Sequence, residues 1–289
     1  MMNNNTLITI KNTALVKKRT IELSVFIMKT ALGFIILFPI WVMLSWSLRP
    51  DAELVKYGAS LFPKTWTLEY YKWSFENLNL LRYILNSFIM FFIIFGGHVV
   101  FANLAAYAFV FFKFKGKALI FGMILVAQVI PGEINIITNY ITIQKLGLID
   151  TFLGLTLPSI VSGMSIFIMR QFFLTVPKEL KEAAELDGCK DMRFLTSILV
   201  PISVPTLAAL GINDFIGVYN SWFWPLLVTN KDSMRTVQIG LAQSMTGDVY
   251  DEYGRMLAAA MVVIIPTLIV FVIGQGYLIK GMVSGSVKG

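Results

Sequence analysis

Long apolar runs alternate with short polar segments along this chain. Six of the runs reach the roughly 20 residues that a helix needs to cross about 30 Å of hydrocarbon. They lie at about 26–48, 83–112, 118–141, 151–174, 202–228 and 256–280. The first run follows basic residues, as in a secretory signal, but it is too long for one and lacks a small-residue cleavage site before Trp46. The pattern therefore predicts an all-α membrane protein with six transmembrane helices.

Composition supports this interpretation and excludes several classes of protein. Of the 289 residues, 56% are hydrophobic and 14% are charged, and the mean hydropathy is +0.72. Soluble domains have about 25% charged residues. A single cysteine and a single histidine exclude a disulfide framework and a His/Cys metal cage within the chain. We therefore expect no metal and no cofactor.

The net charge of +7 follows from topology. Fifteen of the 24 Lys and Arg residues lie in the N-terminal stretch, near 113–117, within 170–200 and in the tail. These segments carry +9, the alternate loops carry zero, and two acids inside the spans supply the remaining −2. The positive-inside rule then predicts cytoplasmic segments at 1–25 and 281–289 around a transmembrane domain at 26–280. Nucleic-acid binding is not needed to explain the charge.

The outer loops have their own composition. The loop at 49–82 is long and aromatic, and we expect a short amphipathic segment there, either as an aromatic belt at the interface or as a binding surface. The loop at 229–255 carries four acids, which predicts a solvated face that could meet a soluble partner.

The inner segment at about 175–201 is longer than a connection requires. Pro177 can open a helix there, because the first turn has no partner for its N–H. An apolar stripe at helical spacing follows, made of Leu180, Ala183 and Ala184. Gly188 suits the left-handed residue that ends a helix, and Asp191 can cap a second helix that runs to Pro201. The unit is either a solvated loop or a site where another protein docks.

The same segment resembles the EAA signature of permease subunits in binding-protein-dependent ABC importers. The matching residues are Glu182, Ala183, Ala184, Asp187, Gly188, Ile198 and Pro201. Val200 stands where the family usually has Leu. The carbohydrate, maltose-type branch of the family is also similar to this chain at 130–132, 153–180 and 281–289. The likeness extends over most of the chain from about residue 30 onward.

The resemblance implies a type I ABC importer permease fold within a larger assembly. Two homologous permease subunits would form the pathway in the lipid bilayer, a dimer of ATP-binding subunits would dock below, and an extracytoplasmic solute-binding protein would deliver the solute. A coupling helix between spans four and five would transmit the ATPase motion. The ATPase-coupling residues would be Glu182, Ala183, Ala184, Asp187, Gly188 and Pro201.

The chain itself lacks the groups that hydrolysis of ATP requires. A phosphate-binding loop would need glycine at Phe111 and Ser or Thr at Ala118, around the pair Gly116 and Lys117. We therefore expect a non-catalytic subunit, with hydrolysis in a separate polypeptide.

Polar and aromatic residues inside the spans are candidates for the solute pathway, because polar groups are costly there. The candidates are Glu133, Asn213, Asp214, Tyr219, Asn220, Trp222 and Trp224. Amides can bind sugar hydroxyls and aromatic rings can stack on sugars, but interhelical hydrogen bonding explains each residue as well and is preferred. Pro131 with Gly132 and, separately, Gly211 are candidates for helix discontinuities. His98 is expected to pack between helices, and Cys189 to be a small residue in a turn.

One difference from the family limits the pathway assignment. Tyr219 and Ser221 replace the Trp and Asp that the carbohydrate branch often has in span five, so no role of that acid transfers to this chain. The leading interpretation is a multi-pass permease subunit in the bacterial cell membrane that imports an oligosaccharide. The alternatives are the same machine importing a polyol or a sugar phosphate, and an ion-coupled secondary carrier, which would need inverted repeats and paired midplane carboxylates.

Overall fold

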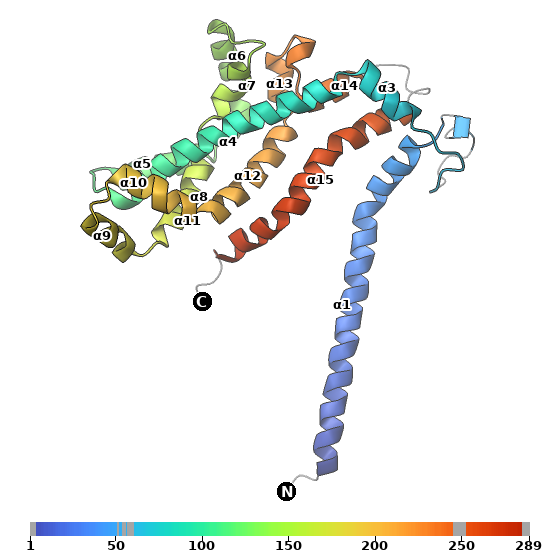
Figure 1. Ribbon diagram of the computed structural model, residues 1–289, viewed down its shortest axis with the longest axis horizontal. Helices are drawn as coiled ribbons and strands as arrows, with labels where there is room; N and C mark the ends of the chain where they lie inside the picture. The colour runs from blue at the N-terminus through green and yellow to red at the C-terminus, as the bar shows by residue number, and fades with distance from the viewer. Residues whose placement is uncertain (1–3, 51, 54–55, 57–60, 245–252, 285–289) are drawn as a thin grey trace. The chain divides into compact units, whose positions relative to one another are not determined.

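The computed structural model describes residues 4–50, 52–53, 56, 61–244 and 253–284, and every regular element within them is a helix. Three described helices are long and apolar enough to cross a membrane alone, at Lys18–Ser47, Leu80–Phe111 and Tyr253–Tyr277. Two bent helix pairs meet the same test as broken spans. The all-α membrane fold is confirmed, whereas the count of six spans stays a prediction. Figure 1 shows the helices in order along the chain.

The chain divides into two compact units, residues 1–72 with 248–261 and residues 73–247 with 262–289. In the first unit, α1 (Asn4–Ser47) starts well before the predicted span, since no glycine or proline interrupts the chain before Gly33. Phe34, Ile35 and Ile36 are 68–74% exposed, as expected for a helix that meets lipid or another subunit.

The segment after α1 folds onto the end of that helix. Arg49 is fully buried and donates from Nη2 to the Ser45 hydroxyl over 3.0 Å. Glu53 accepts hydrogen bonds from the backbone N–H groups of Lys64 and Thr65, at 2.7 and 3.0 Å. These bonds, that from Lys64 first, lower the pKa of Glu53 to about 2. The loop in which we expect an amphipathic segment contains the short helix α3 (Glu69–Asn77).

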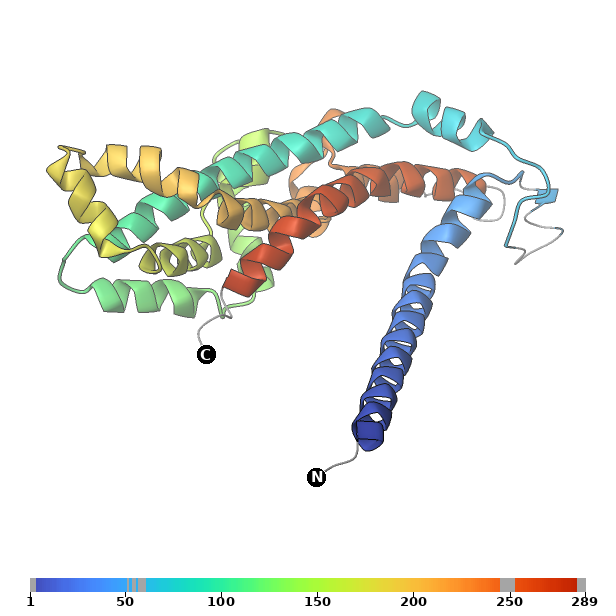
Figure 2. The ribbon, with the colours of Figure 1, turned by 60° about the horizontal axis from the view of Figure 1, so that its bottom comes forward.

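The second unit is built around α4 (Leu80–Phe111), which contacts α8 (Gly163–Leu174) and α12 (Val204–Tyr219). Figures 1 and 2 show α5 (Lys117–Ala127), α9 (Lys178–Leu186) and α10 (Asp191–Phe194) at one end of α4. A Cβ at Gly211 would press against the Phe95 ring at 3.0 Å. Gly211 is therefore a point of close approach within a continuous α12, and the discontinuity predicted there was wrong.

The third apolar run is divided, as the pair Pro131 and Gly132 allowed. It forms α5, the 3₁₀ turn η1 (Gly132–Asn135) and α6 (Ile136–Lys145). Proline removes a backbone donor and glycine adds conformational freedom, so the α-helix ends before them.

The fourth and fifth predicted runs are not single straight helices. The fourth consists of α7 (Phe152–Thr156), η2 (Leu157–Ser159) and α8, with a bend of 52°. Thr151 and Ser162 cap α7 and α8 by accepting from the N–H groups of Gly154 and Ser165. The fifth, predicted as one run at 202–228, ends at Tyr219 with α12 and resumes as α13 (Phe223–Val228), so the single helix expected there was wrong. On its other side, α12 meets α10, the π-helical turn η3 (Leu195–Leu199) and α11 (Val200–Ile202) of the inner segment at a bend of 72°.

The remaining elements of this unit follow α12. They are α13 (Phe223–Val228), η4 (Asp232–Met234), α14 (Val237–Ser244) and the C-terminal part of α15 (Tyr253–Ser284). Asp150 has φ of +59° and accepts from the backbone N–H groups of Asn230 and Lys231, which joins the second outer loop to the third.

Candidate coupling helix and translocation site

The helix α9 forms where the sequence predicts the first helix of the inner segment. Pro177 precedes it, and Glu179 in its first turn faces the positive end of the helix dipole. Gly188 has φ of +74°, its N–H donates to the Glu185 carbonyl over 2.9 Å, and the N–H of Cys189 donates to the Ala184 carbonyl over 2.8 Å. This is the Schellman arrangement, which satisfies the last carbonyls of a helix. The predicted turn at Gly188 is confirmed.

The two faces of α9 have different environments. Glu182 and Ala183 are exposed, and Leu186 at the end of the helix is 90% exposed. Ala184 is 7% exposed and packs against the chain's own core. The expected coupling residues thus separate: Ala184 faces inward and cannot itself contact a partner, whereas Ala183 and Glu182 can.

The other expected coupling residues lie at the borders of this unit. Asp187 is exposed at the C-cap of α9. Pro201 is exposed in α11, near the bend into α12, where its missing N–H and the preceding π-helical turn disturb the helical hydrogen bonding.

Asp191 does not cap the second helix, so that expectation was wrong. It is the first residue of α10, and its Oδ1 accepts from the Tyr107 hydroxyl over 2.5 Å and from Lys181 Nζ over 2.7 Å. The bonds from Lys181 and Tyr107 lower the pKa of Asp191. Burial lowers the pKa of Lys181, but the hydrogen bonds that it donates, to Asp191 first and then to Glu185, outweigh burial and raise its pKa. Both groups of the pair are therefore charged near neutral pH.

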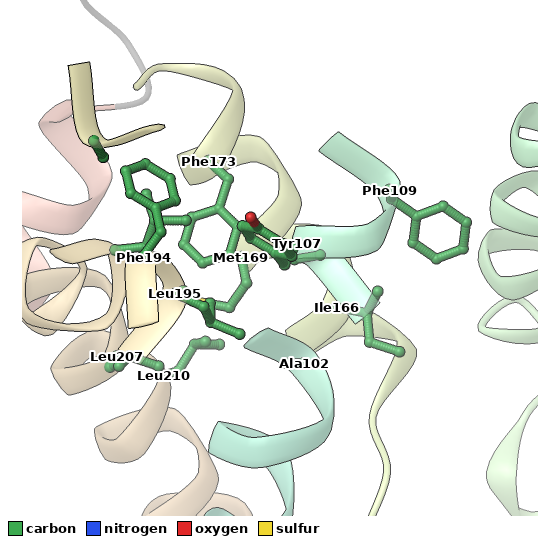
Figure 3. Close-up of a cluster of buried hydrophobic side chains, with 13 residues drawn as sticks. Ala102, Tyr107, Phe109, Ile166, Met169, Phe173, Phe194, Leu195, Leu207 and Leu210 are labelled. Carbon is green, nitrogen blue, oxygen red and sulfur yellow. The ribbon is translucent and has the colours of Figure 1, made fainter. Parts of the chain in front are cut away.

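An apolar cluster holds α10 and η3 against α4 and α8. Phe194 and Leu199 are fully buried, and Figure 3 shows Phe194 gathered with Phe173, Met169 and Tyr107. The ring centroids of Tyr107 and Phe194 are 6.4 Å apart, within the range of favourable aromatic pairs. The segment between spans four and five is thus part of the core, which a simple connecting loop would not be.

One face of α12 carries exposed polar positions. Asn213, Gly217 and Asn220 recur at helical spacing and are all exposed, and a Cβ at Gly217 would meet no heavy atom within 4 Å. The side-chain oxygen Oδ1 of Asn220 accepts from Gln238 Nε2 over 3.3 Å. The described residues leave this strip open, so it is available to a solute or to another subunit.

The aromatic candidates divide between core and surface. Tyr219 is 1% exposed and donates its hydroxyl to the Val263 carbonyl over 3.0 Å. Trp224 donates from Nε1 to the carbonyls of Gly154 and Leu155, at 3.2 and 3.1 Å. Both act within the fold, as the interhelical interpretation predicts. Trp222 is 59% exposed and is the aromatic ring available for stacking.

Asp214 is paired with His98. Its Oδ2 lies 2.8 Å from His98 Nδ1, and His98 Nε2 lies 2.8 Å from the carbonyl of Ser159. His98 is 8% exposed. The pair joins α12, α4 and the break before α8, so His98 lies between helices as expected and Asp214 is held within the protein.

Glu133 is the remaining candidate for the solute pathway. Glu133 lies in η1, and its side chain is outside the described residues. Among the described residues, no group of three or more His, Cys, Asp or Glu is placed to hold a metal ion.

An outer cluster was missed by sequence reasoning. Asp232, expected on a solvated face, accepts from Asn79 Nδ2 at 2.6 Å, from the Tyr83 hydroxyl at 2.5 Å and from Arg235 Nη1 at 2.9 Å. The bond from Tyr83, followed by that from Asn79, lowers the pKa of Asp232. Its partners on α4 are about 150 residues away in sequence, and no local signal points to them.

Known proteins share this architecture. The chain is 36% identical over 261 residues to the sn-glycerol-3-phosphate transport system permease protein UgpE of Brucella abortus, covering 87% of this chain and 93% of that protein. It is 34% identical over 263 residues to the arabinooligosaccharides transport system permease protein AraQ of Halalkalibacterium halodurans, covering 89% and 93%.

A solved structure agrees in fold. The crystal structure of a bacterial ABC transporter involved in the import of the acidic polysaccharide alginate matches 90% of this chain and 97% of its own, with a TM-score of 0.78 at 20% identity. The sequence profile of one family, described as binding-protein-dependent transport system inner membrane component, matches residues 20–283. The chain therefore belongs to this family of membrane-embedded transport permease components.

Proposed function

We propose that this chain is a non-catalytic permease subunit of an ATP-driven importer for carbohydrates or related solutes. It pairs with a second, homologous permease, with a dimer of ATP-binding subunits and with an extracytoplasmic solute-binding protein. The observation that carries the proposal is α9, a short helix with an exposed outer face and a glycine-terminated end, built into the core beneath α4 and α8. A rigidly mounted helix with an exposed leucine at its end suits docking to another protein.

The charge distribution supports an orientation. The segment that contains α9 and the N-terminal stretch belong to the basic set of segments, so we place both on the cytoplasmic side, where ATP is available. The chain is then a multi-pass protein of the cell membrane with both termini in the cytoplasm.

The exposed strip on α12 supports an assignment to the solute pathway. Asn213 and Asn220 offer amide donors and acceptors of the kind that bind hydroxyl groups, and Trp222 offers an exposed aromatic face. Residues 204–228 contain no Lys or Arg, which favours an uncharged carbohydrate at this helix. The UgpE relatives favour the second candidate, a sugar phosphate such as sn-glycerol 3-phosphate.

The decisive experiment is reconstitution of the assembly in proteoliposomes. ATP-driven uptake of radiolabelled arabinotriose and of sn-glycerol 3-phosphate is measured with the binding protein present, and a binding panel on the binding protein ranks other sugars and polyols. We expect uptake of one class that stops without ATP. Uptake driven by a proton or sodium gradient without ATP would contradict the importer and support the secondary carrier.

A further inference from the structure

Three segments meet at one carboxylate oxygen near the end of α4. Tyr107 on α4 and Lys181 on α9 both donate to Asp191 Oδ1 on α10, over 2.5 and 2.7 Å. Lys181 Nζ also lies 2.9 Å from Glu185 Oε1, one turn along α9. We call Tyr107, Lys181 and Asp191 the α9 clamp.

The α9 clamp lies at the edge of the apolar cluster. Tyr107 is 4% exposed, and the Lys181 side chain is 13% exposed. Lys181 Nζ lies 5.0 Å from the centroid of the Phe194 ring, close enough for a cation–π interaction. The Asp191 side chain is 49% exposed, so the donors of the α9 clamp are shielded from water and its acceptor is half in contact with it. The bond from Lys181 joins two charged groups, and such charge-assisted hydrogen bonds are stronger than neutral ones.

Apolar packing alone does not orient α9. Ala184 is the single buried residue of α9, and Val176 and Cys189 on either side of the helix pack against the same cluster. These contacts hold α9 in place but are small along its length, whereas hydrogen bonds from Lys181 and Tyr107 to Asp191 also oppose rotation of the helix about its axis. Because the Asp191 side chain is 49% exposed, we expect the ion pair to add little to stability, and specifying one arrangement is the better attested effect of such paired charges.

We propose that Tyr107, Lys181 and Asp191 are positioning residues for coupling, which fix α9 against α4 so that displacement of α9 moves α4. Without the α9 clamp, rotation of α9 would absorb the displacement that a docked ATPase subunit imposes. The inference rests on the proposed function, and it adds the residues through which motion passes from the docking helix into the membrane helices.

The first test measures solute imported per ATP hydrolysed in proteoliposomes that contain the whole assembly. For Asp191→Asn and Lys181→Met we expect the ratio to fall by at least about fivefold, the lower range of couplings between sites, while the ATP-binding subunits still co-purify. Tyr107→Phe, which removes a single hydroxyl, should lower it less. The charge exchange Lys181→Asp with Asp191→Lys should restore part of the loss. The matched control is Arg193→Gln, an exposed change of charge on α10.

The second test does not need the solute. Spin labels at Lys178 on α9 and Val100 on α4, both exposed, are introduced with Cys189→Ser in the assembled complex in nanodiscs. Double electron–electron resonance should give a narrow distribution of distances between the two labels when the α9 clamp is native. It should give a broader distribution for Tyr107→Phe and Asp191→Asn.

These measurements separate the two proposals. If the native assembly imports neither probe with ATP, the transport proposal fails, and the distance distributions still test the α9 clamp. Equal distributions in native and variant complexes, or an unchanged ratio of solute to ATP in Asp191→Asn, would overturn the inference. The inference would also be contradicted if the charge exchange gave a ratio of solute to ATP no higher than those of Asp191→Asn and Lys181→Met.

Discussion

Replacing Gly188 tests whether the geometry at the end of α9 matters for docking. Its φ of +74° lies in the left-handed region, and a Cβ there would meet no heavy atom within 4 Å. The cost of Gly188→Ala is therefore conformational alone, about 1–2 kcal/mol. A destabilisation of this size shifts an equilibrium by a factor of about 5 to 30. Gly188→Asn should cost less, because Asn adopts this region more readily.

Gly188→Pro should have the largest effect in the series. Proline holds φ at about −65° and has no N–H, so the native turn and the hydrogen bond to the Glu185 carbonyl are both lost. The assay combines affinity of the purified permease for the ATP-binding subunits with ATP-driven uptake in proteoliposomes. We expect both to decrease in the order Gly, Asn, Ala, Pro, with normal membrane insertion.

Two results would contradict the proposed role of the turn at Gly188. If Gly188→Pro binds the ATP-binding subunits and supports uptake as the native chain does, the turn is not needed and the assignment of α9 is wrong. If Gly188→Asn is as damaging as Gly188→Pro, the left-handed backbone is not the cause. Glu182→Lys reverses a charge on the exposed face of α9 without touching the turn, and we expect it to abolish uptake too.

Three further predictions concern the fold. His98→Ala leaves the largely buried carboxylate of Asp214 without its hydrogen-bond partner, so the unfolding free energy in detergent should fall by about 1–3 kcal/mol, seen as a lower Tm; an unchanged Tm would contradict the pair. Trp224→Phe removes the donor to two carbonyls of α7, and the Tm should fall more than for Trp222→Phe, which alters an exposed ring. Asp232 has a lowered pKa, so its stabilising effect is present above its unfolded pKa near about 4 and is lost as pH falls through the lower folded value. The Tm difference between native chain and Asp232→Asn should therefore narrow from pH 6 towards pH 3, and a constant difference would refute this.

The helices of the inner segment follow from short-range chemistry. Proline is tolerated at the start of a helix, as Pro177 is here, and glycine is the residue type that ends a helix in the left-handed conformation, as Gly188 does. The helix between them was therefore predictable from a few neighbouring residues. The end of α5 before Pro131 has the same origin, because the missing donor of proline acts within one turn.

Assignments that depended on distant partners could not be made in this way. Asp191 has the side chain of a helix cap, but a tyrosine 84 residues earlier in the chain and a lysine on the preceding helix occupy its oxygen. Ala184 belongs to the signature stripe, yet the core beneath it decides that it faces inward. Tyr219 and Trp224 suit sugar stacking by type, and only the positions of the carbonyls on α15 and α7 show that their polar atoms are engaged.

The amino-acid sequence by itself determined that this is a helical membrane protein, that the third apolar run breaks at Pro131 and Gly132, and which inner segment forms the glycine-terminated helix. Hydropathy over about 20 residues and the backbone preferences of Gly and Pro act locally, so they can be read without the fold. The tertiary structure alone decided which polar groups are held inside the protein and which stay open. A hydrogen bond of 2.5 Å between residues about 150 positions apart exists only after packing has brought two helices together.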